Sequence, residues 1–179
     1  MQREDVGDLF GPFLARIRPA RILEIGTSSG GFTMILHDLC EELELHIPIW
    51  TLEIVDQPWF TRLRDVGIRT ISENLFSPDY LSLARPELVV PFIQSPGISV
   101  VLCDGGSKKD EFRLLKPFLK PGDYIAAHDY APNKEIYEKQ FKDKIWNWME
   151  IQDSDIDMTD LEDLPEFNEV AWKMARNLR

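Results

Sequence analysis

The stretch that decides the fold lies near the start of the chain, where residues 20–31 read ARILEIGTSSGG. Ile22, Leu23 and Ile25 form a short apolar run, typical of a buried strand, that ends at Gly26. The turn that follows leads directly into an apolar helical pattern. Glycines in such a turn permit positive φ and a close approach of a ligand, and the helix N-terminus offers free N–H groups to an anionic group. The stretch therefore predicts a strand–turn–helix unit that holds a ligand at its turn.

Strand and helix patterns alternate along the rest of the chain, as in α/β proteins. Strands are expected at 20–26, 47–54, 68–71, 98–103 and 124–127, with a closing strand at 170–174. Helices are expected at 30–45, 58–66, 108–119 and 132–144, and at 5–18, where Gly11-Pro12 should break or restart the helix. Residues 79–95 read as partly helical, 145–151 as helix or strand, and 153–166 as a polar loop. The alternation predicts an α/β, doubly wound, mostly parallel sheet with helices on both faces and an antiparallel closing strand.

Length and composition are those of a single globular domain. The 179 residues allow one well-buried core, with an N-terminal helical segment at 1–18, a ligand-binding core at 19–144 and an acidic segment at 145–179. The N-terminus shows no apolar region of a secretory signal, and no apolar run reaches the roughly 18 residues of a membrane span. Because the two cysteines lie in apolar stretches, we expect reduced thiols and a cytoplasmic location.

The charge balance argues against nucleic acid and membranes as partners. The chain has 31 acidic residues against 20 Lys and Arg, a formal charge of −11, and such a protein does not attract phosphate backbones over a distance. Arg62, Arg64 and Arg69 form a local basic cluster that fits a solvated face. We expect a small-molecule partner, and a homodimer would complete a pocket for which this short chain has little room. Trp146 and Trp148 fit core packing or a subunit contact better than an acceptor pocket.

Polar side chains cluster at the carboxyl ends of the predicted parallel strands, where open α/β sheets bind ligands. The second strand ends in Glu53, whose carboxylate is well placed to accept hydrogen bonds from both hydroxyls of a ribose. The third strand leads to Asn74, the fourth ends in Asp104 and the fifth in His128-Asp129. A purely structural domain has little reason to collect such groups, so this edge of the sheet is the predicted active site.

The glycine-rich turn fits two other motifs only in part. A dinucleotide fingerprint has glycine at its first, third and sixth positions, but here Ser28 stands between Gly26 and Gly31. An NAD-type oxidoreductase therefore stays an alternative, although this chain lacks the middle glycine that lets the pyrophosphate approach the backbone. Residues 26–30 also match the nucleophile elbow G-x-S-x-G. A hydrolase is disfavoured because this elbow lies on the first strand, which leaves no upstream sheet for an oxyanion loop.

The motif Glu24-Ile-Gly-Thr-Ser-Ser-Gly-Gly31, followed by Glu53 and Asp104, resembles a class I S-adenosylmethionine-dependent methyltransferase over roughly residues 5–130. The stretches at 102–110 and 119–130 resemble the branch that contains macrocin-type sugar O-methyltransferases and cephalosporin hydroxylase-like proteins. The resemblance implies S-adenosylmethionine as cofactor and transfer of its methyl group to a small molecule, at oxygen. A catalytically silent S-adenosylmethionine-binding domain that acts through a partner is the alternative.

The resemblance also implies a role for each matching residue. The backbone of Gly26, Thr27, Ser28 and Gly30 would pass under the amino-acid end and ribose of the cofactor. Glu24 would support this loop or bind the methionine amino group through water. Glu53 would hold the ribose hydroxyls, and Ile54 beside it would also belong to the cofactor site. Asn74 and Leu75 would meet the adenine ring, and Asp104 would lie beside the sulfonium and the acceptor.

A divalent metal in that branch is held by the residue at Asp104 and by two acids after the fifth strand. This chain departs from the pattern, with His128-Asp129 in place of two acids and Gly106-Ser107 where a base is usual. The histidine weakens a site for Mg²⁺, and two carboxylates with one imidazole could instead favour Mn²⁺, Fe²⁺ or Zn²⁺, so Mg²⁺ or Mn²⁺ is the expected ion. His128 could instead act as a general base or have no chemical duty. Asp104, His128 and Asp129 are therefore the candidate catalytic residues and metal ligands.

Overall fold

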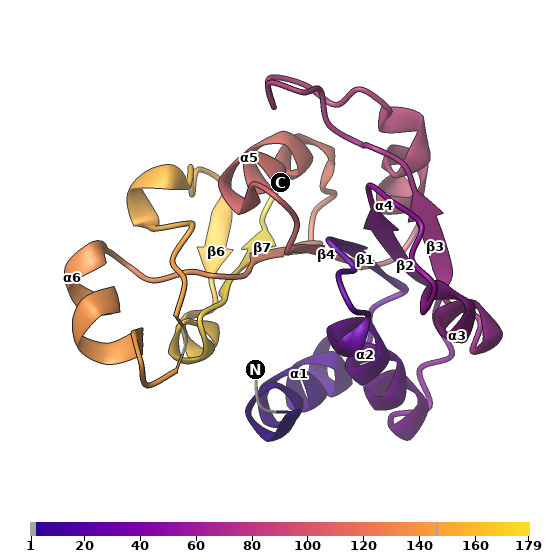
Figure 1. Ribbon diagram of the computed structural model, residues 1–179, viewed down its shortest axis with the longest axis horizontal. Helices are drawn as coiled ribbons and strands as arrows, with labels where there is room; N and C mark the ends of the chain where they lie inside the picture. The colour runs from indigo at the N-terminus through magenta and orange to yellow at the C-terminus, as the bar shows by residue number, and fades with distance from the viewer. Residues whose placement is uncertain (1–2, 146) are drawn as a thin grey trace.

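The fold is seen in a computed structural model that describes residues 3–145 and 147–179 (Figure 1). A seven-stranded sheet has the order β3-β2-β1-β4-β5-β7-β6. Its strands are β1 (Arg21–Ile25), β2 (Ile49–Glu53), β3 (Arg69–Ser72), β4 (Ser99–Cys103), β5 (Tyr124–Ala127), β6 (Leu161–Asp163) and β7 (Lys173–Asn177). Strands β1 to β5 are parallel, whereas β7 is antiparallel to both β5 and β6. The predicted fold class and the antiparallel closing strand are confirmed.

Helices cover both faces of this sheet, as Figure 1 shows. On one face lie α1 (Arg3–Ile17), α2 (Gly31–Glu42) and α3 (Phe60–Asp65), and on the other α4 (Val90–Gln94) and α5 (Lys108–Leu115). Beyond β5, α6 (Lys134–Ile136) continues as a π-helix at Tyr137–Phe141. Single 3-10 turns lie at Pro86–Leu88, Lys116–Phe118 and Asp153–Asp155, and a longer 3-10 segment at Pro165–Val170.

The central strands are buried on both faces, and their side chains alternate between two cores. In β1, Ile22 packs with the residues of α1 and α2, whereas Leu23 and Ile25 pack with those of α4 and α5. All five residues of β4 are buried as well. This explains the neighbouring apolar residues Ile22 and Leu23 and the continuous apolar run at 100–103, since strands covered on both sides do not alternate in polarity. The two cores hold the carboxyl ends of β1 and β4 side by side.

The first helix runs unbroken through Pro12, so the predicted break at Gly11-Pro12 is wrong. A proline inside a helix costs about 3 kcal/mol because it removes a hydrogen bond and crowds the preceding turn. Here packing outweighs that cost. Phe10 is fully buried and makes edge contacts with the rings of Phe32, Phe167 and Trp172. Aromatic contacts of this kind, added to the buried area, hold the helix in register.

The C-terminal third departs most from the prediction. The expected helix at 132–144 is a single α-turn followed by the π-helix, and the expected loop at 153–166 contains β6. The closing strand lies at 173–177 instead of 170–174, because Ala171 adopts a left-handed turn with φ of 62° before the strand begins. In the stretch 145–151, Ile151 makes one isolated bridge with Tyr130 and belongs to no named helix or strand. Trp146 lies outside the described residues, and Trp148 is 62% exposed instead of packed in the core.

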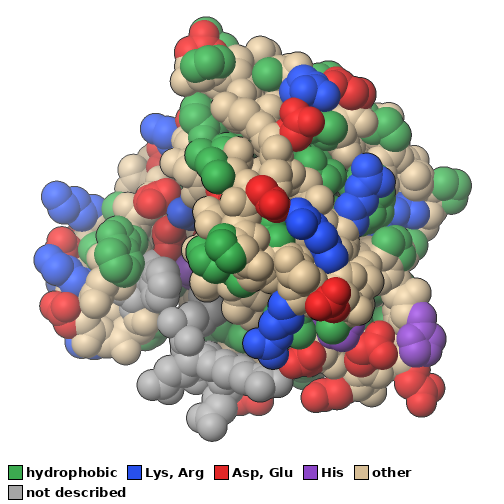
Figure 2. Space-filling view, turned by 45° about the vertical axis from the view of Figure 1, so that its right-hand side comes forward, with side chains coloured by type: hydrophobic (Ala, Val, Ile, Leu, Met, Phe, Trp, Pro, Cys, Tyr) green, Lys and Arg blue, Asp and Glu red, His purple; other side chains and the backbone are tan. Residues whose placement is uncertain are grey.

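The surface carries both signs of charge. Acidic and basic side chains are interspersed on the face in Figure 2. Within the basic cluster foreseen from the sequence, Arg64 pairs with Asp56 and Arg69 lies 4.1 Å from the ring centre of Trp50. The guanidinium groups of these two residues therefore have partners within the chain. No helix in the described part of the protein is long and apolar enough to cross a membrane.

Candidate functional site

A pocket of about 290 Å³ lies at the carboxyl ends of β1, β2, β3 and β4. It is lined by Ile25, Gly26, Ser28, Leu52, Glu53, Ile54, Glu73, Asn74, Leu75, Phe76, Tyr80, Asp104, Gly105, Gly106 and Glu111. Seven residues predicted for cofactor binding are among them, namely Gly26, Ser28, Glu53, Ile54, Asn74, Leu75 and Asp104. Parallel strands bring these distant residues together because their carboxyl ends share one edge of the sheet.

The glycine-rich turn forms one wall of the pocket, and the position of Gly26 leaves no room for a side chain. It has φ of +90°, and a Cβ built there would lie 2.2 Å from the carbonyl oxygen of Asp104. The backbone N–H groups of Gly26 and Thr27 both donate to the carbonyl of Leu52, at 2.8 and 3.1 Å. Gly30, with φ of +73°, is the N-cap of α2. The turn is thus pressed against the ends of the two neighbouring strands.

Glu24 lies below this turn and does not line the pocket. Its side chain is buried, and Oε2 accepts hydrogen bonds from the hydroxyls of Thr33 and Thr51, both at 2.5 Å. The hydroxyls of Thr51 and Thr27 lie 2.6 Å apart and extend the network to the turn. Burial raises the pKa of Glu24 to about 7, although the threonine hydrogen bonds oppose the shift. Of its two implied roles, this geometry favours support of the loop over contact with a ligand.

Glu53 joins the turn to the end of β2. Its Oε2 accepts from the backbone N–H of Ser28 at 3.0 Å, and its Oε1 accepts from the backbone N–H of Ile54 at 2.9 Å. The carboxylate lines the pocket and can still accept further hydrogen bonds, because each oxygen has two lone pairs. Trp59 supports the same turn, since its Nε1–H donates to the carbonyl of Ser28 at 2.8 Å. Ile54 is 65% exposed at the pocket rim.

The side of the pocket beyond β3 is largely apolar. Leu75 is 2% exposed, and Asn74 caps the local turn by accepting from the N–H of Phe76 at 3.1 Å. The rings of Phe76 and Tyr80 stack with centres 5.3 Å apart. Sequence reasoning missed these two aromatic residues, because they follow the strand within a stretch without clear periodicity.

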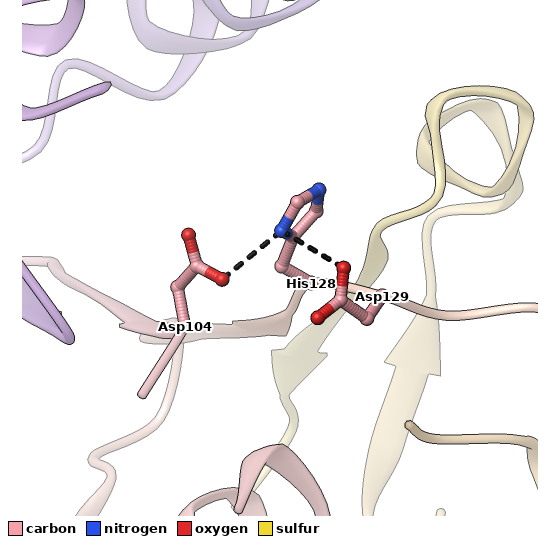
Figure 3. A group of neighbouring side chains, drawn as sticks. All are labelled: Asp104, His128 and Asp129. Carbon is pink, nitrogen blue, oxygen red and sulfur yellow. Dashed lines mark hydrogen bonds and ion pairs between the residues drawn. The ribbon is translucent and has the colours of Figure 1, made fainter. Parts of the chain in front are cut away.

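Asp104, His128 and Asp129 meet where β4 and β5 end, beside the pocket (Figure 3). Figure 3 shows the imidazole between the two carboxylates, with Nδ1 3.0 Å from Oδ1 of Asp104 and 3.4 Å from Oδ1 of Asp129. One ligand atom from each residue lies within 4.8 Å of the others, so the group could hold a metal ion. Asp104 is 22% exposed, whereas the side chains of His128 and Asp129 are 4% and 6% exposed. Asp104 is therefore the member of the group that faces the pocket.

Lys108, the first residue of α5, belongs to the same cluster and was missed. Its Nζ lies 2.9 Å from Oδ2 of Asp129, 3.1 Å from Oε2 of Glu150 and 3.9 Å from Oδ1 of Asp104. Burial by itself would lower the pKa of Lys108, but the hydrogen bonds and charges of these acids outweigh it and raise the pKa. The side chain is thus an ammonium at neutral pH. From the sequence, a lysine in the first turn of a helix reads as a solvated residue.

Glu111 was missed as well, and it holds the loop after β4. Its two oxygens accept from the backbone N–H groups of Gly105 and Ser107, both at 3.0 Å. Burial raises the pKa of Glu111 to about 7, against the effect of these hydrogen bonds. The signal was present as an acid in the first turn of a helix, where carboxylates often bind free N–H groups.

Solved structures with the same fold include one with SAM bound and one with SAH bound. The apo-structure of CmcI-N160 aligns over 98% of this chain and 71% of its own, with TM-score 0.63 and 11% identity. SAH-bound PaMTH1 of Podospora anserina, a methyltransferase, aligns over 100% and 80%, with TM-score 0.55 and 14% identity. The O-methyltransferase TomG of Streptomyces achromogenes, involved in tomaymycin synthesis and solved with SAM, aligns over 98% and 80%, with TM-score 0.52 and 14% identity. No protein-family profile and no curated protein matches the sequence. These likenesses and the strand order confirm the class I S-adenosylmethionine-dependent methyltransferase fold.

Proposed function

We propose that this chain, which has the class I methyltransferase fold, transfers a methyl group from S-adenosylmethionine to a hydroxyl of a small molecule. The observation that carries the proposal is the composition of the pocket. The carboxylate of Glu53, the turn at Gly26 and the apolar surface of Leu75 line one cavity, with Asp104 at its other side. A ribose, an amino-acid tail and an adenine each find a matching surface there, and these groups together are S-adenosylmethionine.

The reaction asks little covalent chemistry of the protein. The acceptor oxygen attacks the methyl carbon in line with the sulfur, the S–CH₃ bond breaks as the O–CH₃ bond forms, and the sulfonium becomes a neutral thioether. The protein aligns the two reactants and excludes water. The hydroxyl proton must also leave. We assign its acceptance to Asp104, which faces the pocket and is held by His128 Nδ1 at 3.0 Å.

Metal assistance is the second form of this proposal, and one observation favours it. Asp104, His128 and Asp129 offer three ligand atoms within 4.8 Å of one another. The Asp129 carboxylate also binds the Lys108 ammonium, with Oδ2 2.9 Å from Nζ, and His128 Nδ1 lies 3.0 Å from Asp104 and 3.4 Å from Asp129. A divalent ion does not fit this arrangement while the ammonium is in place. No step of the proposed reaction therefore passes through a metal.

Isothermal titration with S-adenosylmethionine and S-adenosylhomocysteine tests cofactor binding, with NADH as the control ligand. We expect micromolar affinity for the two sulfur compounds and none for NADH. Glu53→Ala should weaken both by roughly 10- to 100-fold, since a hydrogen bond to a charged group contributes about 1.5–3 kcal/mol. Glu162→Ala is the matched control, because this exposed carboxylate lies on β6, outside the pocket-lining set. Absence of binding to either sulfur compound would refute the proposal.

Turnover separates an enzyme from a silent binding domain. The protein is incubated with S-adenosylmethionine and a panel of hydroxylated small molecules, and release of S-adenosylhomocysteine is measured. Release that depends on an acceptor and falls in Asp104→Asn supports methyl transfer at oxygen. Tight cofactor binding with no release from any acceptor would favour the silent S-adenosylmethionine-binding domain instead.

A further inference from the structure

A buried ammonium lies among three carboxylates at the edge of the pocket. Lys108 is 8% exposed, and its Nζ lies 2.9 Å from Asp129, 3.1 Å from Glu150 and 3.9 Å from Asp104. The three acids come from different segments, since Asp104 follows β4, Asp129 follows β5 and Glu150 precedes Ile151. Charged side chains are rarely buried unless they are paired. The arrangement therefore has the form of a cation site built around the chain's own lysine.

The carboxylates that meet this ammonium are the same ones that could ligate a metal. Asp129 uses Oδ2 for Lys108 and has Oδ1 3.4 Å from His128 Nδ1. A divalent ion bound at this carboxylate would thus have to displace the Lys108 ammonium, whose Nζ lies 2.9 Å from Oδ2.

The backbone also fixes the cluster in place. Asp129 adopts φ of +59°, a left-handed conformation that is uncommon outside glycine, asparagine and aspartate. Its carbonyl accepts from the N–H of Glu150 at 2.9 Å, which brings the segment with the third acid over the lysine.

We propose that the ammonium of Lys108 takes the place of a divalent cation at the Asp104–Asp129 pair, so that this site works without a metal. In this role Lys108 is a positioning residue. It balances the charge of Asp129 and Glu150 and leaves Asp104 free to face the acceptor. The inference deepens the proposed methyl transfer and rests on it for the reaction, but cation binding is measured without cofactor or acceptor. The two claims can therefore fail separately.

The experiment is a Mn²⁺ titration of the cofactor-free protein, in which electron paramagnetic resonance reports the free hydrated ion. Wild type is compared with Lys108→Met, which keeps the length of the side chain but removes its charge. Lys109→Met is the matched control, because Lys109 is the next residue of the same helix and is exposed. The double variant Lys108→Met/Asp129→Asn tests whether any new binding uses the proposed carboxylates. Circular dichroism of each variant establishes that it is folded.

We expect wild type and Lys109→Met to leave Mn²⁺ free through the millimolar range. Lys108→Met should bind one Mn²⁺ per chain at least tenfold more tightly, and Asp129→Asn in that background should abolish the gain. Stoichiometric Mn²⁺ binding by wild type, lost in Asp129→Asn, would overturn the proposal, and so would a folded Lys108→Met variant that gains no affinity. If Lys108→Met does not fold, Lys108→Gln replaces it. The wild-type titration then still decides whether the site with its lysine binds Mn²⁺. Cofactor binding and turnover of wild type in EDTA form a separate readout, in which an unchanged rate is expected and a loss of activity restored by Mn²⁺ would refute metal independence.

Discussion

Replacing Gly26 by alanine should damage both the stability of the protein and its cofactor pocket. At φ of +90° an L-residue is strained by about 1–2 kcal/mol. The new Cβ would also lie 2.2 Å from the carbonyl oxygen and 2.4 Å from the carbonyl carbon of Asp104, which are backbone atoms that cannot rotate away. Overpacking of this kind adds about 1–3 kcal/mol. We therefore expect Gly26→Ala to lower the free energy of unfolding by about 2–5 kcal/mol.

Gly67→Ala supplies the matched control for this prediction. Gly67 has nearly the same φ, +89°, but no other atom lies within 4 Å of its Cβ position, so only the backbone strain of about 1–2 kcal/mol applies. Urea unfolding of both variants measures the free energies, and titration with S-adenosylhomocysteine measures the pocket. Asp104 must move in the Gly26→Ala variant, so the affinity of this variant for S-adenosylhomocysteine should fall at least tenfold. Gly67→Ala should keep the wild-type affinity. Equal unfolding free energies, or equal affinities, would refute the reasoning.

Three further predictions follow from buried groups and from the turn. In the folded protein the pKa of Glu24 is raised from about 4.5 to about 7, so the unfolded chain releases this proton first as pH rises. The folded state therefore loses about 3 kcal/mol of stability, which is fully present below pH 4.5, between pH 4.5 and 7. Urea midpoints at pH 5 and pH 8 should therefore differ less in Glu24→Gln than in wild type, with Glu111 contributing the remaining slope. Trp59→Phe removes a hydrogen bond to Ser28, so urea unfolding should show a free energy of unfolding lower by about 1 kcal/mol, and unchanged stability would contradict the contact. Burial raises the pKa of the Cys40 thiol to about 11 and also raises that of Cys103, so native protein at pH 8 should react with a thiol reagent only after unfolding in urea.

Most of the sheet could be predicted because its strands carry their own local signals. Strand β1 is rich in β-branched and other apolar residues, β4 contains the continuous apolar run 100–103, β2 ends at Glu53, and β5 is followed by His128. The predictions failed where a local signal was outweighed or lacking. Pro12 is a helix breaker by itself, but the buried ring of Phe10 beside it holds the helix together. Strand β6 has three residues and one buried side chain, too few for any periodicity.

The cofactor side of the site could be read from the sequence for a geometric reason. Parallel strands place their carboxyl ends along one edge, so Gly26, Glu53 and Asp104 had to converge once the strands were identified. That these residues line one pocket can therefore be predicted without knowing how the side chains pack.

On the other side of the pocket the sequence predicted Asp104, His128 and Asp129, but only the tertiary structure decided which groups surround them. Nothing near Lys108 in the sequence indicates that its ammonium meets Asp129 and Glu150, or that Glu24 points away from the pocket into a threonine network. These choices depend on which charges a nearly dry interior can compensate, and the compensating groups come from distant segments of the chain. Local sequence determined where the pocket lies, and the need to balance buried charge determined that the Lys108 ammonium lies beside it.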